Sequence, residues 1–141
     1  MSQFFTHHRR VEFAETDAAG IAHFSAFFLY MEQTEHAMWR HLGLSVFPML
    51  TSVGEVSWPR VAASCQYRGP VRFEQTLEIH LQIARLGDKS ITFQYEMFLN
   101  ANKVADGETT TVCCRMSEGH KIESVRIPDE VRAKLTPYVR A

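Results

Sequence analysis

The sequence predicts an α+β fold in which an antiparallel sheet of about five strands wraps around one long central helix. Two patterns support this prediction. Apolar residues recur with helical spacing from Phe24 to about Gly43, and apolar and polar residues alternate with a period of two after Pro48. The chain has 141 residues, which is enough for one domain with its own core. We therefore expect a single domain that covers residues 1–141.

The expected elements are separated by residues that favour turns. Clean alternation of Leu77, Ile79, Leu81 and Ile83 predicts the strand at 76–85. Gly-Pro, Gly-Asp and Asn-Ala-Asn sequences punctuate the chain around the expected strands. The expected order is a strand at 7–13, the helix, strands at 55–67, 76–85, 91–97, 104–116 and 121–126, and a helical turn after residue 128.

One face of the expected helix is apolar but contains a carboxylate. At 100° per residue, Glu35 lies about 20° from Phe24 on the helical wheel. A carboxylate on a buried face must be paired or have a shifted pKa. We expect Glu35 to form an ion pair across a subunit interface or to reach solvent at a tilted helix end. The apolar residues of this face are Phe24, Phe28, Met31, Met38 and Leu42.

Composition excludes several classes of protein. A net charge of −1 gives no field that would attract nucleic acid or an anionic membrane. The chain has no 18-residue apolar stretch and no pattern of a signal peptide at its start. Its three cysteines, Cys65, Cys113 and Cys114, are an odd number and include an adjacent pair, which suits reduced thiols in a cytoplasmic protein. No spacing typical of metal ligands occurs, so we expect no bound metal. Because no long apolar stretch occurs either, we expect no membrane insertion.

The segment from 11 to 24 is the strongest candidate for a functional site. It combines a strand pattern, a loop with one carboxylate, Asp17, and the start of the amphipathic helix. Backbone N–H groups at a helix start have no partner within the helix and can polarise a carbonyl. An acid beside such groups is a minimal apparatus for acyl transfer. A turn aspartate or a helix cap is the alternative interpretation of Asp17.

Three segments resemble those of a known family, the hotdog-fold acyl-CoA thioesterases, in the 4-hydroxybenzoyl-CoA thioesterase and YbgC-like branch. Residues 15–21, Glu-Thr-Asp-Ala-Ala-Gly-Ile, resemble the acid loop of that branch, and residues 24–32 resemble the start of its central helix. Residues 85–90, Arg-Leu-Gly-Asp-Lys-Ser, resemble its hairpin near the phosphates of coenzyme A. The order of elements matches over nearly the whole chain.

The resemblance implies an acyl-CoA thioesterase in which Asp17 is the nucleophile or the general base. The backbone N–H of Phe24 would hold the oxyanion, and His23, Gly20 and Trp58 would contact the substrate. The chain departs from the family pattern of an aromatic residue followed by a histidine, because His23 precedes Phe24. A catalytic histidine is therefore not carried over. No cofactor is implied, since coenzyme A is part of the substrate.

The resemblance also implies how coenzyme A and the subunits are held. Arg85, Lys89 and Ser90 would bind the coenzyme A phosphates, with Arg126 as a weaker candidate. The family joins two sheets across a two-fold axis, which implies a homodimer that pairs again into a tetramer. A second hotdog branch has its catalytic carboxylate on the central helix, which gives Glu35 a catalytic alternative.

Two other functions stay open on the sequence. A hotdog acyl-CoA hydratase or dehydratase would use a paired acid and histidine, but its Asp-x-Asn-Pro-x-His motif is absent, because Asp17 precedes His23 by Ala-Ala-Gly-Ile-Ala. A non-catalytic acyl-CoA-binding protein would keep the pocket without needing the acid.

Overall fold

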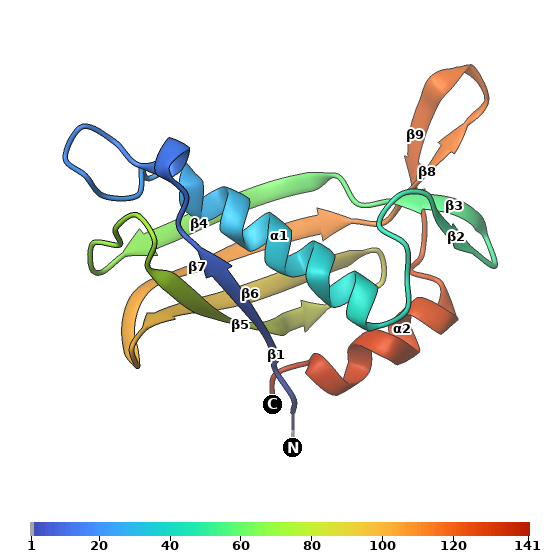
Figure 1. Cartoon of the computed structure of the whole chain (residues 1–141). Coiled ribbons are helices and arrows are strands. Elements are labelled where there is room, and N and C mark those ends of the chain that lie inside the picture. Colours follow the sequence, from blue (N-terminus) through green and yellow to red (C-terminus); the bar gives the residue numbers. More distant parts are fainter. Residues whose placement is uncertain (1) are drawn as a thin grey trace.

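The computed structural model describes residues 2–141. It consists of antiparallel strands with two α-helices (Figure 1). Helix α1 spans Ala26–His41 and helix α2 spans Asp129–Leu135. The strands are β1 (Phe5–Arg10), β2 (Met49–Thr51), β3 (Gly54–Ser57), β4 (Arg60–Tyr67), β5 (Thr76–Leu86), β6 (Ser90–Leu99), β7 (Asn102–Val112), β8 (Cys114–Ser117) and β9 (Lys121–Ser124).

The strands form two sheets. The larger one has five strands in the order β1-β5-β6-β7-β4, and the smaller one has four in the order β2-β3-β8-β9. The smaller sheet lies beyond the end of the larger one, with the β8–β9 hairpin standing away from the body (Figure 1). The α+β class and a five-stranded antiparallel sheet agree with the sequence prediction.

Two expected strands are each divided between the sheets. The stretch at 55–67 is interrupted by Trp58 and Pro59, so β3 belongs to the smaller sheet and β4 to the larger one. Proline cannot donate a ladder hydrogen bond, which explains the break. The stretch at 104–116 is interrupted at Cys113, whose N–H donates to the carbonyl oxygen of Lys89. The four-stranded sheet was not predicted.

The prediction of one long helix from Phe24 to about Gly43 was wrong in detail. Helix α1 has 16 residues, and α2 adds a second helix of seven where only a turn was expected. The buried stripe of α1 is also rotated from the expected face, because Phe24 is 63% exposed while Tyr30 is fully buried. The residues of α1 that pack on the sheet are Ala26, Phe27, Tyr30, Met31, Thr34, Glu35, Met38 and Trp39.

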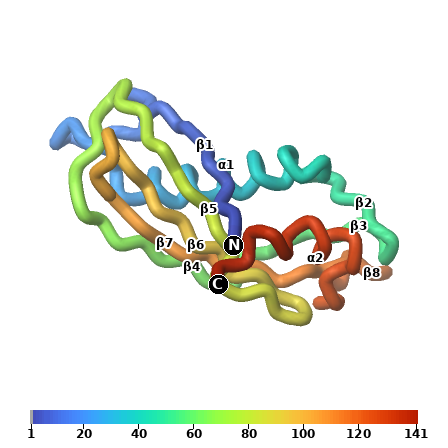
Figure 2. The backbone as a smooth tube through the Cα atoms, turned by 90° about the horizontal axis from the view of Figure 1, so that it is seen from below, coloured from blue at the N-terminus to red at the C-terminus, as the bar shows by residue number. Residues whose placement is uncertain are grey.

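The core lies between α1 and the inward face of the larger sheet. Strands β5 and β6 contribute alternate residues with no exposed surface, such as Leu81 and Phe93. Figure 2 shows the molecule from below, with the two chain ends side by side next to the sheet. Backbone contacts agree with this view, because the Gln3 N–H donates to the carbonyl oxygen of Pro137. The acid loop at 17–21 and the β5–β6 hairpin lie at opposite ends of the larger sheet (Figure 1).

Candidate active site

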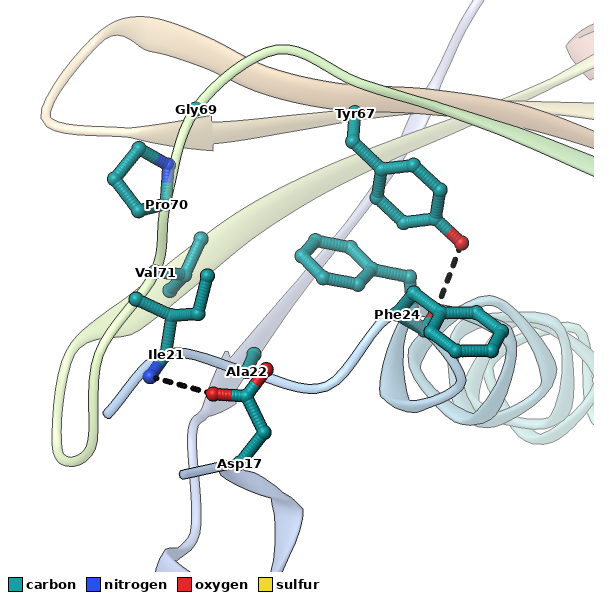
Figure 3. A pocket seen from close by; sticks show the side chains of 9 residues that line it. Asp17, Ile21, Ala22, Phe24, Tyr67, Gly69, Pro70 and Val71 are labelled. Carbon is teal, nitrogen blue, oxygen red and sulfur yellow. Dashed lines mark hydrogen bonds between the residues drawn. The ribbon is translucent and has the colours of Figure 1, made fainter. Parts of the chain in front are cut away.

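A pocket of about 350 Å³ lies at the start of α1 and contains Asp17. Its lining is mostly apolar and comes from three parts of the chain: the acid loop, the start of α1, and the segment that follows β4 (Figure 3). Asp17 contributes the only carboxylate of this lining. The lining residues are Asp17, Ile21, Ala22, Phe24, Phe27, Tyr67, Gly69, Pro70 and Val71.

The acid loop is closed by its own backbone. The Asp17 N–H donates to the Ile21 carbonyl oxygen at 2.9 Å, and the Gly20 N–H donates to the Asp17 carbonyl oxygen at 2.9 Å. Gly20 adopts a φ of +79°, which residues with a side chain rarely adopt. Asp17 Oδ1 accepts hydrogen bonds from the N–H groups of Ala19, at 2.9 Å, and Ile21, at 3.5 Å. Within residues 2–141 its second oxygen, Oδ2, accepts none, so it is available to a ligand in the pocket.

Glu15 anchors the loop to the rest of the fold. Its carboxylate pairs with Arg9 of β1 and accepts a hydrogen bond from the Tyr30 hydroxyl of α1 at 3.0 Å. Its backbone carbonyl oxygen accepts from the His23 N–H at 2.8 Å. Burial alone would raise the pKa of Glu15, but the hydrogen bonds from Arg9, the Glu12 backbone and Tyr30 bring it below its usual value. An ionised Glu15 thus ties the loop to both the sheet and the helix.

Phe24, just before the start of α1, lines the same pocket as Asp17. Phe24 lies two residues before α1, and within the described chain its N–H has no hydrogen-bond partner. The Tyr67 hydroxyl donates to the Phe24 carbonyl oxygen at 2.9 Å and so fixes this peptide from the β4 side (Figure 3). An unpartnered N–H of a residue that lines a mostly apolar pocket is a candidate oxyanion donor.

His23 and Gly20 lie beside the pocket rather than in its lining. The His23 ring packs against Phe24 in a tilted arrangement with 4.4 Å between the ring centroids, and its Nδ1 is 2.7 Å from the Ser25 hydroxyl. His23 is exposed, so its ring can reach a ligand at the mouth of the pocket. Gly20 shapes the loop that presents Asp17.

Trp58 lies in a different hollow of the same subunit. Its ring stacks on Trp39 with 5.3 Å between centroids, and its indole nitrogen lies 3.2 Å from the Met49 sulfur. It borders a small pocket of about 90 Å³ with Glu35 and Arg60. A single chain therefore does not bring Trp58 to Asp17.

The residues expected to bind phosphate lie on the β5–β6 hairpin, at the far end of the sheet from Asp17. Strand β5 has 11 residues, which corresponds to about 35 Å of extended chain. Arg85 and Lys89 are exposed, and neither forms an ion pair with another described residue. Ser90 closes the turn, because its carbonyl oxygen accepts from the Gly87 N–H at 2.8 Å. Arg126 is engaged by Asp88 and Asp129.

Glu35 forms an ion pair inside the subunit, so the expectation of a pair across an interface or of a solvated helix end is wrong. Only 2% of its surface is exposed. Its carboxylate accepts hydrogen bonds from the Arg60 guanidinium at 2.8 Å and the Trp39 indole at 3.1 Å. Glu32 also pairs with Arg60, at 3.2 Å. Burial raises the pKa of Glu35, and the charge of Arg60 opposes this effect only in part.

This shift predicts that the stability of the protein depends on pH through Glu35. Above the ordinary pKa of 4.5 the unfolded chain releases the proton while the folded one retains it, so stability falls as the pH rises. Glu35→Gln cannot titrate, so its unfolding free energy relative to the parent should increase as the pH rises above about 4, by at most about 1.4 kcal/mol per pH unit, until the folded carboxyl also ionises. Urea unfolding of both proteins across this range measures the difference. A difference that does not change with pH would contradict the raised pKa.

Tyr67 is the residue of the pocket that the sequence did not indicate. It ends β4, which is otherwise mostly exposed, and it packs edge-on against Phe27 with 5.2 Å between ring centroids. The nearby Gly69-Pro70 turn is the one available signal, because it marks where the strand stops beside a loop. The pairing of that loop with the acid loop joins residues about 50 positions apart, through the Ala22 N–H and the Val71 carbonyl oxygen at 2.7 Å. Periodicity in a single segment does not reveal such a contact.

Residues 2–141 contain no group of three or more His, Cys, Asp or Glu side chains arranged to hold a metal ion. None of the described helices has the length and apolar character needed to cross a membrane.

The known proteins that this chain resembles are named as esterases or as CoA thioester hydrolases. A protein of Aquifex aeolicus, named only provisionally as an esterase, is 33% identical over 127 residues, which cover 90% of this chain and 94% of that protein. The 1,4-dihydroxy-2-naphthoyl-CoA hydrolase of Synechococcus elongatus is 30% identical over 105 residues, or 74% of this chain and 77% of that enzyme. The solved 1,4-dihydroxy-2-naphthoyl-CoA thioesterase from Synechocystis superposes with a TM-score of 0.83 and 25% identity over 95% of this chain and 96% of that one.

The family description agrees with these relatives. Residues 11–135 match the family described as the thioesterase-like superfamily. This range includes the acid loop, α1, all strands from β2 to β9 and the whole of α2. The resemblance of the sequence to the hotdog-fold thioesterases is thus confirmed, and the chain belongs to the thioesterase-like superfamily.

Proposed function

We propose that this thioester hydrolase cleaves an aroyl-CoA or a small to medium acyl-CoA into the free acid and coenzyme A, with Asp17 as the reacting carboxylate. The observation that carries the proposal is the placement of Asp17 in an apolar pocket beside the start of α1. Relatives named 1,4-dihydroxy-2-naphthoyl-CoA hydrolase support an aromatic acyl group. The aromatic side chains of Phe24, Phe27 and Tyr67 in the pocket suit such a group.

The geometry accommodates two forms of the reaction. In one, Asp17 Oδ2 attacks the thioester carbon, the C–S bond breaks, and water then cleaves the resulting anhydride. In the other, Asp17 removes a proton from a water molecule that attacks the same carbon. In both, negative charge develops on the thioester oxygen, and the free Phe24 N–H is the proposed donor to it. Thiolate is a good leaving group, so little acid assistance is required.

A dimer accounts for the distance between the proposed catalytic and phosphate-binding residues. Within one chain, Asp17 and the Arg85–Ser90 hairpin lie at opposite ends of the larger sheet (Figure 1). Antiparallel pairing of two β4 edges would bring the hairpin end of one sheet next to the Asp17 end of the other. Coenzyme A would then extend from Asp17 of one subunit to Arg85 and Lys89 of its neighbour. We therefore include a homodimer, which can pair again into a tetramer, in the proposal.

A panel of acyl-CoA thioesters with a thiol-detecting dye tests the activity. Hydrolysis releases free thiol, and we expect the highest kcat/KM for aromatic acyl groups. A hydratase would instead change the absorbance of an enoyl-CoA without releasing thiol. A binding protein would produce neither signal, and either of these two results would contradict the proposal.

The combined change Arg85→Ala with Lys89→Ala is expected to raise KM for acyl-CoA by about tenfold and to leave kcat nearly unchanged. The reason is that the phosphates lie far from the bond that breaks, so their contacts are the same in the bound substrate and in the transition state. Steady-state kinetics with acyl-CoA and with a short thioester that lacks the nucleotide measure this effect.

The short thioester serves as the internal control for that variant. Its KM should not change, because it carries no phosphate. An equal rise in KM for both substrates would show that the hairpin affects folding or pocket shape. Arg126→Ala is a matched control on the same surface, since Asp88 and Asp129 already occupy its guanidinium.

A further inference from the structure

One face of the smaller sheet exposes three large apolar side chains, although Glu55 lies on the same face and Cys114 on it is buried. Met116 of β8 pairs with Ile122 of β9, so their side chains share a face, and the ladders through β3 place Leu50 of β2 on that same face. These three residues, which we call the arm face, are 72% (Leu50), 56% (Met116) and 60% (Ile122) exposed. On the opposite face Met49 and Val56 are buried, while Arg115 and Glu123 form an ion pair that is partly exposed.

The two edges of the larger sheet differ in their protection against pairing. Strand β1 ends in Arg9 and Arg10, and such charges oppose edge-to-edge association. In contrast, residues 61–66 of β4 are Val-Ala-Ala-Ser-Cys-Gln, with no charge and with most side chains exposed. The unprotected edge is therefore β4, and a second copy of the same strand is its simplest partner.

The arm face and the pocket flank the two ends of this edge. Only Trp58 and Pro59 separate the smaller sheet from the start of β4. The end of β4 is Tyr67, which lines the pocket together with Phe24, itself 63% exposed. A two-fold axis through the middle of β4 would place the start of one strand beside the end of the other. It would therefore bring the arm face of each copy to the pocket of its partner.

We propose that the arm face of one subunit covers the Asp17 pocket of the other and forms the wall that contacts the acyl group. The occupant of the arm face is thus a second copy of this chain, and the inference rests on the proposed function for the identity of the ligand. Two apolar surfaces meet twice in such a dimer, because each copy supplies one arm face and one pocket. Met116 and Ile122 then determine which acyl groups fit, and Asp17 acts in a pocket that two chains complete.

Photo-crosslinking tests this placement without reference to activity. The photoreactive amino acid p-benzoylphenylalanine replaces Ile122 in the full chain, and two differently tagged subunits are co-expressed. We expect an adduct between the two tags that maps to residues 17–24 or 67–73. The same probe in place of Glu123, whose carboxylate pairs with Arg115 on the opposite face, is the matched control and should not give this adduct. An adduct within one chain, or an equal yield from the control, would overturn the proposal.

Kinetics of Met116→Ala with Ile122→Ala test the role in specificity. We expect kcat/KM for an aroyl-CoA to fall by about tenfold or more, while the value for acetyl-CoA stays within about twofold, since only the larger group reaches the wall. An equal loss of kcat/KM for both substrates, or no loss for either, would overturn the proposed role of the arm face in specificity. A parent protein that hydrolyses no acyl-CoA would refute the proposed function, and the crosslink would then decide alone whether the arm face covers the partner's pocket.

Discussion

Asp17→Asn is expected to lower kcat for acyl-CoA hydrolysis by at least about a hundredfold, the scale of losing a positioned base or nucleophile. The loop should keep its shape, because the amide oxygen of Asn can accept the same hydrogen bonds from the N–H groups of Ala19 and Ile21. The apolar pocket is unchanged, so binding should be preserved. Turnover measured with the thiol-detecting dye, and binding measured by calorimetry with a non-hydrolysable acyl-CoA analogue, separate the two effects.

Glu35→Gln is the matched control for that variant. It also exchanges a carboxylate for an amide of the same shape, but in the hollow with Arg60 rather than in the pocket. Its turnover should stay within about threefold of the parent, a change of less than 1 kcal/mol in the activation barrier. If Glu35→Gln abolishes turnover and Asp17→Asn does not, the helix carboxylate is the catalyst and the proposed site is wrong.

The features of the fold that the sequence predicted correctly are those that depend on local periodicity. Strands β5 and β6 were expected nearly where they lie, because their alternate residues are fully buried against one helix and so must be apolar. The turns at Gly87 and Asn100 follow from residue preferences in the same way.

The features that the sequence missed depend on contacts between distant segments. Glu35 lies on the buried side of α1, and its partner Arg60 is 25 residues away. The helical wheel therefore indicated a buried carboxylate but could not identify the residue that pairs with it. The rotation of the buried stripe away from Phe24 has the same origin. The chain before α1 is held by Glu15 and Tyr67, and these contacts leave Phe24 at the mouth of the pocket.

In the candidate site, too, local patterns could be predicted and contacts between distant segments could not. Asp17 and the helix start are neighbours in the sequence, so a local motif was enough to place them together. The wall formed by Tyr67, Gly69 and Val71 comes from the end of β4 and the segment that follows it, about 50 residues further along the chain. The structure of one chain also separates Trp58 and the Arg85–Ser90 hairpin from Asp17, and their expected roles depend on how two chains meet.

Ala63→Lys is expected to convert the proposed dimer into a monomer and to lower kcat/KM for acyl-CoA by at least about tenfold. Ala63 is exposed near the middle of β4, where a two-fold axis would bring two lysines together. Like charges facing one another across paired strands are destabilising, and a lysine on an edge strand opposes pairing. Sedimentation at assay concentrations compares the mass with that of the 16.2 kDa chain.

Thr6→Lys is the matched control, because Thr6 is exposed on β1 at the opposite edge of the same sheet. That edge already carries charge, so the variant should keep both the mass and the activity of the parent protein. Loss of activity in Ala63→Lys alone, together with a halved mass, would support a site completed by two chains. A fully active species with the mass of a single chain would contradict it, because one chain keeps Asp17 and the phosphate-binding hairpin at opposite ends of its sheet.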